Sequence, residues 1–251
     1  MNRPFYITSI IIIFFLLSHA SSQEKPIEPN DAEAYNNRGI AHAKIGQYDQ
    51  AALDFSKALE INPRFEKAYN NRGIIYMNKG DYDQAILDFN KAVKINPRFE
   101  QAYNNRGNAY KEKRDYDQAI LDYNKALELN PKYSEAYYNR GNARTNRGQY
   151  DRAILDCNKA LEINPRYEKA YYNRGNAYIE KKQYDEAILD FNKAIEINPG
   201  VGLTYYARGR VYRFKEDYQK CWEDIKKAQN LGYRIPREFL DDLRKASGRE
   251  N

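Results

Sequence analysis

A spacing of 34 residues recurs along this chain of 251 residues and constrains its fold more than any other feature. Two dipeptides keep the interval, Arg-Gly in six places and Asn-Pro in five. A fixed period of this length is typical of repeat proteins, in which each unit is one supersecondary element that stacks on its neighbours. The period divides the chain into six predicted units, which are residues 32–65, 66–99, 100–133, 134–167, 168–201 and 202–235.

Each unit has the pattern of two helices joined by a short turn. In unit 66–99, Gly73 lets the second helix approach the first, and Ala85 gives that second helix a small surface. Asp81 is expected to cap the second helix, with Gln84 completing a capping box. Pro97 ends it, because proline lacks an amide donor and restricts the residue before it. The predicted fold is all-α, and stacking buries the apolar stripes of all units in one continuous core.

Aromatic, small and proline residues follow one fixed order within a unit. Unit 168–201 repeats the order of unit 66–99, which reads Tyr69, Gly73, Tyr76, Ala85, Phe89, Ala92 and Pro97. This order resembles the tetratricopeptide repeat, and the resemblance covers about residues 32–235. It implies a right-handed α-solenoid of helix-turn-helix repeats. It also implies that the first helix of each unit lines a concave face where other proteins bind.

Two charged positions depart from the family's usual pattern in every unit. Arg stands before the glycine, where the family usually has Leu, and Asp stands before the aromatic position of the second helix. Opposite charges repeated in phase predict structural ion pairs, bidentate where geometry permits. An active site is the alternative, but it would have to occur six times. The predicted pairing residues are Arg72, Asp88, Arg106, Asp122, Arg140, Asp156, Arg174 and Asp190.

The resemblance also places the second, fifth, sixth, ninth, twelfth and thirteenth residues of each unit on the concave face. Amides and phenols predominate at the fifth, sixth and ninth of these positions, and the last unit has Arg210 at the ninth and Arg213 at the twelfth. Amides can donate to and accept from a peptide backbone, and Tyr adds flat contact area, so this lining suits an extended peptide. The sixth-position Asn row could instead bond only to neighbouring helices. The family's clamp for a C-terminal carboxylate is not supported, because its Lys and Arg positions are not kept. The candidate peptide-binding residues are Asn36, Asn70, Asn104, Asn108, Tyr138, Asn139, Asn142, Tyr172, Asn173, Asn176, Tyr206, Arg210 and Arg213.

The two ends of the chain differ from the repeats. Residues 1–22 have the cationic start, apolar run and small residues of a cleavable secretory signal peptide, and residues 23–31 form a short linker. An uncleaved N-terminal membrane anchor is the alternative, although the apolar run is shorter than the roughly 20 residues that span a bilayer. Residues 236–247 are predicted to form a polar-faced capping helix, followed by a tail at 248–251. The mature chain is therefore expected to be exported, soluble and not membrane-spanning.

Several functional classes are disfavoured by composition. Only two His are present, and no phosphate loop, metal-spaced Cys/His set or nucleophile motif occurs, so neither an enzyme nor a cofactor is predicted. The net charge is +6, but positive and negative residues alternate along the chain and form no basic stripe. This pattern argues against a nucleic-acid partner. Cys157 and Cys221 lie two units apart and are expected to be buried thiols, too distant to pair. The leading hypothesis is an exported scaffold or adaptor that binds one or more protein segments in its groove; self-assembly of near-uniform units is the alternative.

Overall fold

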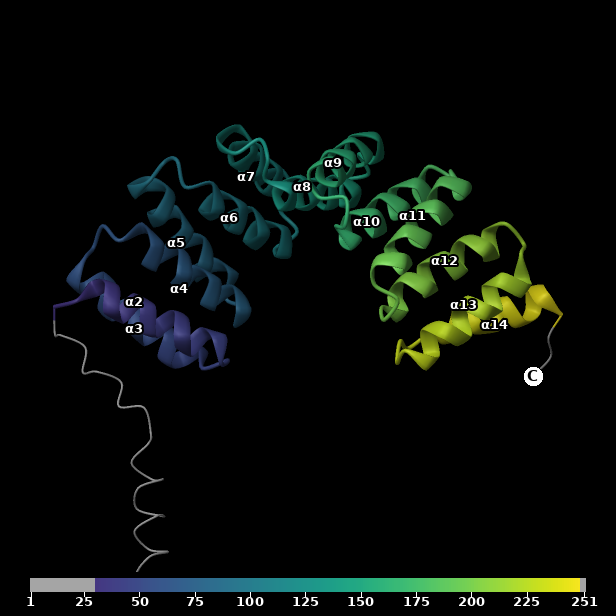
Figure 1. Ribbon diagram of the computed structural model, residues 1–251, viewed down its shortest axis with the longest axis horizontal. Coiled ribbons are helices and arrows are strands. Elements are labelled where there is room, and N and C mark those ends of the chain that lie inside the picture. The colour runs from purple at the N-terminus through teal and green to yellow at the C-terminus, as the bar shows by residue number, and fades with distance from the viewer. Residues whose placement is uncertain (1–29, 249–251) are drawn as a thin grey trace, which may run out of the picture.

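The computed structural model describes residues 30–248, and all of the regular structure in this part of the chain is helical. Six antiparallel helical hairpins follow one another and bend into an arch (Figure 1). The first helices of the hairpins are α2 (Ala32–Lys44), α4 (Glu66–Asn78), α6 (Glu100–Glu112), α8 (Ser134–Asn146), α10 (Glu168–Glu180) and α12 (Gly202–Phe214). The second helices are α3 (Tyr48–Ile61), α5 (Tyr82–Ile95), α7 (Tyr116–Leu129), α9 (Tyr150–Ile163), α11 (Tyr184–Ile197) and α13 (Tyr218–Asn230). A last helix, α14, spans Arg237–Ser247.

The ends of the second helices have local causes in the sequence. The side chain of Asp81 accepts a hydrogen bond from the backbone N–H of Gln84 at 3.2 Å, so the predicted cap of α5 is confirmed. At the other end Asn96 takes an extended conformation, with φ −124° and ψ 93°, directly before Pro97. Proline disfavours helical backbone in the residue before it, and this stops the helix at Ile95.

The turn inside each hairpin contains one residue with positive φ, just before the residue that caps the second helix. Three units place glycine there, as at Gly80 with φ +78°. The other three place Arg114, Lys182 and Glu216 at φ values near +60°. Left-handed backbone costs a non-glycine residue about 1 kcal/mol, so the geometry of the hairpin overrides local preference in these units.

The two helices of a hairpin meet where the glycine after the repeated Arg faces a buried ring. A Cβ built on Gly73 would lie 2.7 Å from the ring of Phe89, which is fully buried. Ala85, in the first half of α5, is also fully buried. A missing side chain on the first helix thus makes the space that an aromatic ring of the second helix fills.

We expect Gly73→Ala to lower the free energy of unfolding by about 2 kcal/mol, because the new methyl group overpacks the contact with Phe89. Gly141 offers a matched control, since Cys157 replaces the aromatic residue and the nearest atom to a new Cβ is the carbonyl oxygen of Ala153 at 3.2 Å. There the gain in helix propensity, about 1 kcal/mol, offsets the tighter fit, so Gly141→Ala should be close to neutral. Urea unfolding followed by circular dichroism measures both; equal losses would rule out the ring contact as the cause.

The curvature of the stack places the first helices on the inside. Adjacent first helices contact one another, as α8 does α10, whereas successive second helices approach less closely. In Figure 1, α6, α8 and α10 accordingly lie on the inner side of the arch and α7, α9 and α11 on the outer side. The concave face is therefore lined by the helices that carry the predicted groove residues.

The sixth hairpin and α14 close the C-terminal end of the core. Leu243 of α14 is fully buried in a cluster with Ile225 and Cys221, and Phe239 and Leu240 pack against the same cluster. Cys157 and Cys221 are both buried free thiols, which confirms that expectation. Burial raises the pKa of each thiol to about 12.

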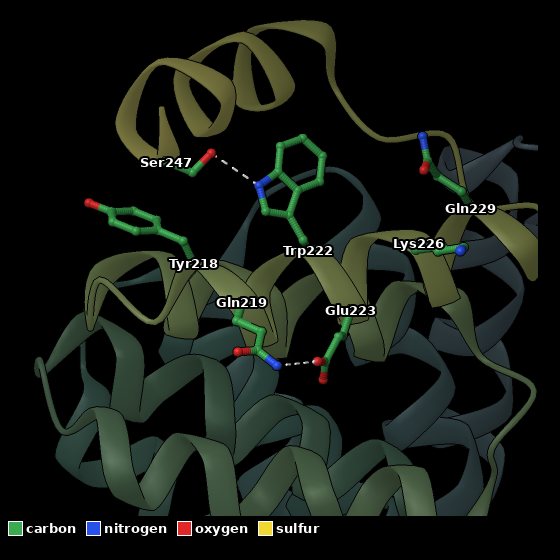
Figure 2. Close-up of a pocket in the computed structure, with 7 residues that line it drawn as sticks. All are labelled: Tyr218, Gln219, Trp222, Glu223, Lys226, Gln229 and Ser247. Carbon is green, nitrogen blue, oxygen red and sulfur yellow. Dashed lines mark hydrogen bonds between the residues drawn. The ribbon is translucent and has the colours of Figure 1, made fainter. Parts of the chain in front are cut away.

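A cleft of about 600 Å³ lies between α13 and α14 (Figure 2). Trp222 stands in it and donates its indole N–H to the hydroxyl of Ser247 at 3.1 Å. Because this is the chain's single Trp, it reports on the contact between the last repeat and α14.

Within residues 30–248, no helix is both long and apolar enough to cross a membrane. The predicted secretory leader at 1–22, and most of the linker at 23–31, lie outside the described residues. Export therefore stays a prediction.

Candidate functional site

The repeated Arg and Asp residues form bidentate ion pairs inside each hairpin. Arg106 on α6 donates from Nε and Nη2 to the two carboxylate oxygens of Asp122 on α7, at 2.7 and 2.6 Å. The aspartates are nearly inaccessible, with 3–5% of their surface exposed. Pairs of the same kind join Arg38 to Asp54, Arg72 to Asp88, Arg140 to Asp156, Arg174 to Asp190 and Arg208 to Asp224.

Each of these arginines has further partners. Arg106 donates from Nη1 to Asn90 in the preceding hairpin at 2.6 Å, and its guanidinium lies 5.4 Å from the ring centre of Tyr103. Burial raises the pKa of Asp122, while the hydrogen bond from Arg106 opposes that rise. Because these charges are satisfied within the fold, they hold hairpins together and offer little to an outside ligand.

In two units the aspartate has a second side-chain partner. His42 places Nδ1 2.9 Å from Asp54 in the first unit, and Arg144 donates to Asp156 at 2.7 Å in the fourth. Both occupy the position that holds Tyr in the other units, for example Tyr110. His42 therefore contacts the Asp54 carboxylate beside Arg38, inside the first hairpin. Residues 30–248 contain no group of His, Cys, Asp or Glu arranged to hold a metal ion.

Asparagines of successive first helices are joined by side-chain hydrogen bonds, and we call this set the asparagine ladder. Asn71 donates to Asn36 at 3.0 Å, Asn105 to Asn70 at 2.9 Å, and Asn139 to Asn104 at 3.0 Å. The three acceptors are at most 6% exposed. The expectation that Asn36, Asn70 and Asn104 line the groove is therefore corrected, because their amides are enclosed between neighbouring first helices.

The asparagine ladder ends where Tyr138 takes the fifth position of the fourth unit. Asn173, which would face an asparagine there, donates to Cys157 Sγ at 3.4 Å and accepts from Asn142 at 3.4 Å. Asn139 and Asn173 are themselves 5% and 3% exposed. Asn139 and Asn173, the two sixth-position residues proposed for the groove, thus bond to neighbouring helices. This arrangement is the alternative to peptide binding that the sequence left open.

Half-buried tyrosines and amides remain on the inner face of the C-terminal units. Tyr138 lies 5.1 Å from Tyr167 between ring centres, and Tyr172 lies 5.8 Å from Phe191. Burial raises the pKa of Tyr138 and of Tyr172, so both phenols stay protonated and able to donate at neutral pH. The half-buried amides of these units are those of Asn142 and Asn176. Asn108, in the third unit, is also half-buried and accepts from the hydroxyl of Tyr123 at 2.7 Å.

The C-terminal end of this face is partly covered by the chain itself. Tyr206 contacts the rings of Tyr233 and Phe239, at 5.2 and 5.3 Å between centres. Arg213 donates from Nε and Nη2 to the two carboxylate oxygens of Asp242 on α14, at 3.0 and 3.3 Å. The expectation for Tyr206 and Arg213 is corrected accordingly, because α14 and the segment before it already occupy much of their surface.

A pocket of about 310 Å³ remains between α12 and α14, lined by Arg210, Arg213, Phe214, Phe239 and Asp242. The sequence predicted the two arginines but not Phe214, Phe239 or Asp242 as site residues. Phe239 packs against the buried cluster beneath α14, and Phe214 has no distinguishing sequence pattern. Their part in the pocket depends on how α14 lies across α12.

These observations define a class of protein, an all-α solenoid whose inner face is lined by the first helices of repeated hairpins. The tetratricopeptide-repeat family model matches residues 32–65, 66–99, 100–133, 134–167 and 168–201. The chain therefore belongs to the tetratricopeptide-repeat family. The sixth hairpin, outside the matched residues, keeps the Arg208–Asp224 pair and the same helical arrangement. Curated proteins give no significant match.

Solved structures share the fold. MamA is 30% identical with a TM-score of 0.59, over 64% of this chain and 94% of MamA. YrrB, described as a repeat protein of this family with an unusual peptide-binding site, is 27% identical with a TM-score of 0.59, over 71% of this chain and 92% of YrrB. The pilF protein of Pseudomonas aeruginosa has a TM-score of 0.75 at 19% identity, over 85% of this chain and 97% of its own, and shows the fold alone.

Proposed function

We propose that this protein is an interaction scaffold that binds an extended polypeptide segment along the inner face of its C-terminal units. The observation that carries the proposal is the row of half-buried Tyr138, Tyr172, Asn142 and Asn176 side chains on α8 and α10. This row begins where the asparagine ladder ends. The fifth position holds a buried Asn in each of the first three units, whereas the fourth and fifth units hold the half-buried Tyr138 and Tyr172 there.

The chemistry of this row suits a peptide backbone. An amide such as that of Asn176 can donate to a backbone carbonyl and accept from a backbone N–H, so it can satisfy an extended chain without reading its sequence. Tyr172 supplies a broad ring with few rotatable bonds, which gives contact area at low entropic cost. The comparison with YrrB supports the same conclusion, since that related structure is described by a peptide-binding site.

Changing Tyr172, Asn176 and Arg210 together to Ala is expected to abolish capture of polypeptide partners while helical content is retained. The measurement is affinity capture from an envelope extract, with circular dichroism on the same samples. A second variant keeps Tyr172 and changes only Asn176 and Arg210, because Tyr172 also packs on Phe191. Its capture should fall as well, which separates lost binding from lost packing.

The matched control changes three exposed residues on the outer surface of α9, Leu155, Lys159 and Glu162, to Ala. We expect it to capture partners as the unchanged protein does. Undiminished capture by both groove variants would contradict the proposal. Loss in the control alone would place the interaction on the outer face, where Leu155 is 63% exposed.

A further inference from the structure

We propose that the pocket between α12 and α14 binds a carboxylate of the polypeptide held in the groove, with Arg210 as the cation that receives it. This inference rests on the function proposed above and names the chemistry that one end of the bound segment must carry. Arg210 and Arg213 lie three residues apart on α12, and both line the pocket.

The pocket contains one more positive charge than negative. Arg213 is engaged by Asp242 through two hydrogen bonds, and no other carboxylate lines the pocket. Among the described residues, no ion pair or hydrogen bond is found for the Arg210 guanidinium. An arginine that lines a cavity without an internal partner is available to an anion, and its fork of donors matches the two oxygens of a carboxylate.

The charge of Arg210 also affects the pKa of two tyrosines beside the pocket. Burial raises the pKa of Tyr172 and of Tyr206, and the positive charge of Arg210 works against that rise in both. The guanidinium is therefore close enough to influence phenols on α10 and α12. A segment lying along Tyr172 and Asn176 on α10 would have the pocket on the next first helix, since α10 and α12 are in contact.

The walls of the pocket are aromatic. Phe214 is 49% exposed and stacks on Tyr184, with 5.5 Å between ring centres, while Phe239 contacts Tyr206 edge-on. The pocket thus offers a cation beside apolar surface, which suits a carboxylate carried next to an apolar side chain. Asp242 disfavours a phosphate group in the same place, because its negative charge would repel a doubly charged anion more than a singly charged one.

The charge of Asp242 should weaken carboxylate binding in the pocket. Asp242 holds Arg213 in the free protein, yet 58% of its side chain is exposed, so solvent screens its pair with Arg213. Asp242→Asn removes that charge and leaves Arg213 available to the ligand. Carboxylate binding should therefore strengthen in this variant, a gain that general damage to the fold would not produce.

The test uses the purified protein and three pools of N-terminally biotinylated octapeptides built from neutral residues. One pool ends in a free carboxylate, one in a carboxamide, and one in a carboxamide with a single Glu inside the sequence. We expect about tenfold greater retention of a carboxylate pool than of the neutral pool. One charge-assisted hydrogen bond contributes enough binding free energy for a difference of this size. The pool that is enriched tells whether the carboxylate is a C-terminus or a side chain.

Two variants complete the experiment. Arg210→Gln should bring retention of all pools to the level of the neutral pool without abolishing it, and Asp242→Asn should raise retention of the carboxylate pool. Equal retention of the three pools by the unchanged protein would overturn the proposed carboxylate site. The proposal that the groove binds polypeptide would still stand. Failure to retain any pool would count against both the groove and the pocket.

Discussion

Replacing Asp122 by Ala is expected to lower the free energy of unfolding by about 3 kcal/mol, the largest single effect that we anticipate in the repeats. The substitution removes both acceptors from Arg106 and leaves a largely buried guanidinium facing a gap, since only 18% of that side chain is exposed. A buried charge without its partner is much less stable than a buried pair, because neither water nor a counter-charge replaces what is lost. Urea unfolding followed by circular dichroism measures the change.

The control for this prediction lies in the same helix. Asp117 also pairs with an arginine, Arg147 of the next hairpin, but 68% of its side chain is exposed. Asp117→Ala should cost at most about 1 kcal/mol, because solvent screens exposed ion pairs. If both substitutions in α7 lowered the free energy of unfolding equally, burial would not explain the contribution of the repeated Arg–Asp pair to stability.

Replacing Leu243 by Ala is expected to release α14 from the last repeat. Leu243 is fully buried, and truncating a buried leucine costs about 3 kcal/mol. Helix α14 has only 11 residues and is too short to persist alone, so once undocked it should lose its helical structure. The clusters of buried residues in the first five hairpins do not include α14, so these hairpins should remain folded.

Trp222 gives the readout of this release. Its indole lies between α13 and α14 and is bonded to Ser247, so undocking should expose it and move its fluorescence to longer wavelength (Figure 2). Lys245→Ala, at an exposed position of the same helix, should leave the emission unchanged. An unchanged emission in Leu243→Ala would show that the cap is held by other contacts, such as Arg213 with Asp242.

The architecture could be predicted from the sequence because residues that pack together recur at the same positions of every 34-residue unit. The glycine of each unit faces the position 16 residues later, and the same spacing separates Arg106 from Asp122, so one repeat contains both partners of these contacts. The cap of α5 by Asp81 could be predicted for the same reason, since both partners are local. Contacts that recur inside one unit can be found from spacing alone.

The groove could be predicted only in part, because its details depend on rotation of one helix against another. Asn70 and Asn71 are neighbours in sequence, yet Asn71 bonds to the preceding unit and Asn70 to the following one. The period does not show which of two adjacent amides points to solvent. The pairing of Arg213 with Asp242 depends in the same way on the direction of α14, which lies outside the repeat and has no second copy in the chain.

The asparagine ladder sets limits on how the order of the hairpins could change. Units 66–99 and 100–133 each carry an amide acceptor at the fifth position and an amide donor at the sixth, so a duplicated copy of either would meet a matching amide on both sides. A copy inserted after unit 134–167 would meet the phenol of Tyr138 instead, where Asn173 now bonds to Cys157. Lengthening by duplication is thus compatible with the N-terminal half of the array, whereas the hairpins from Tyr138 onward form a fixed succession.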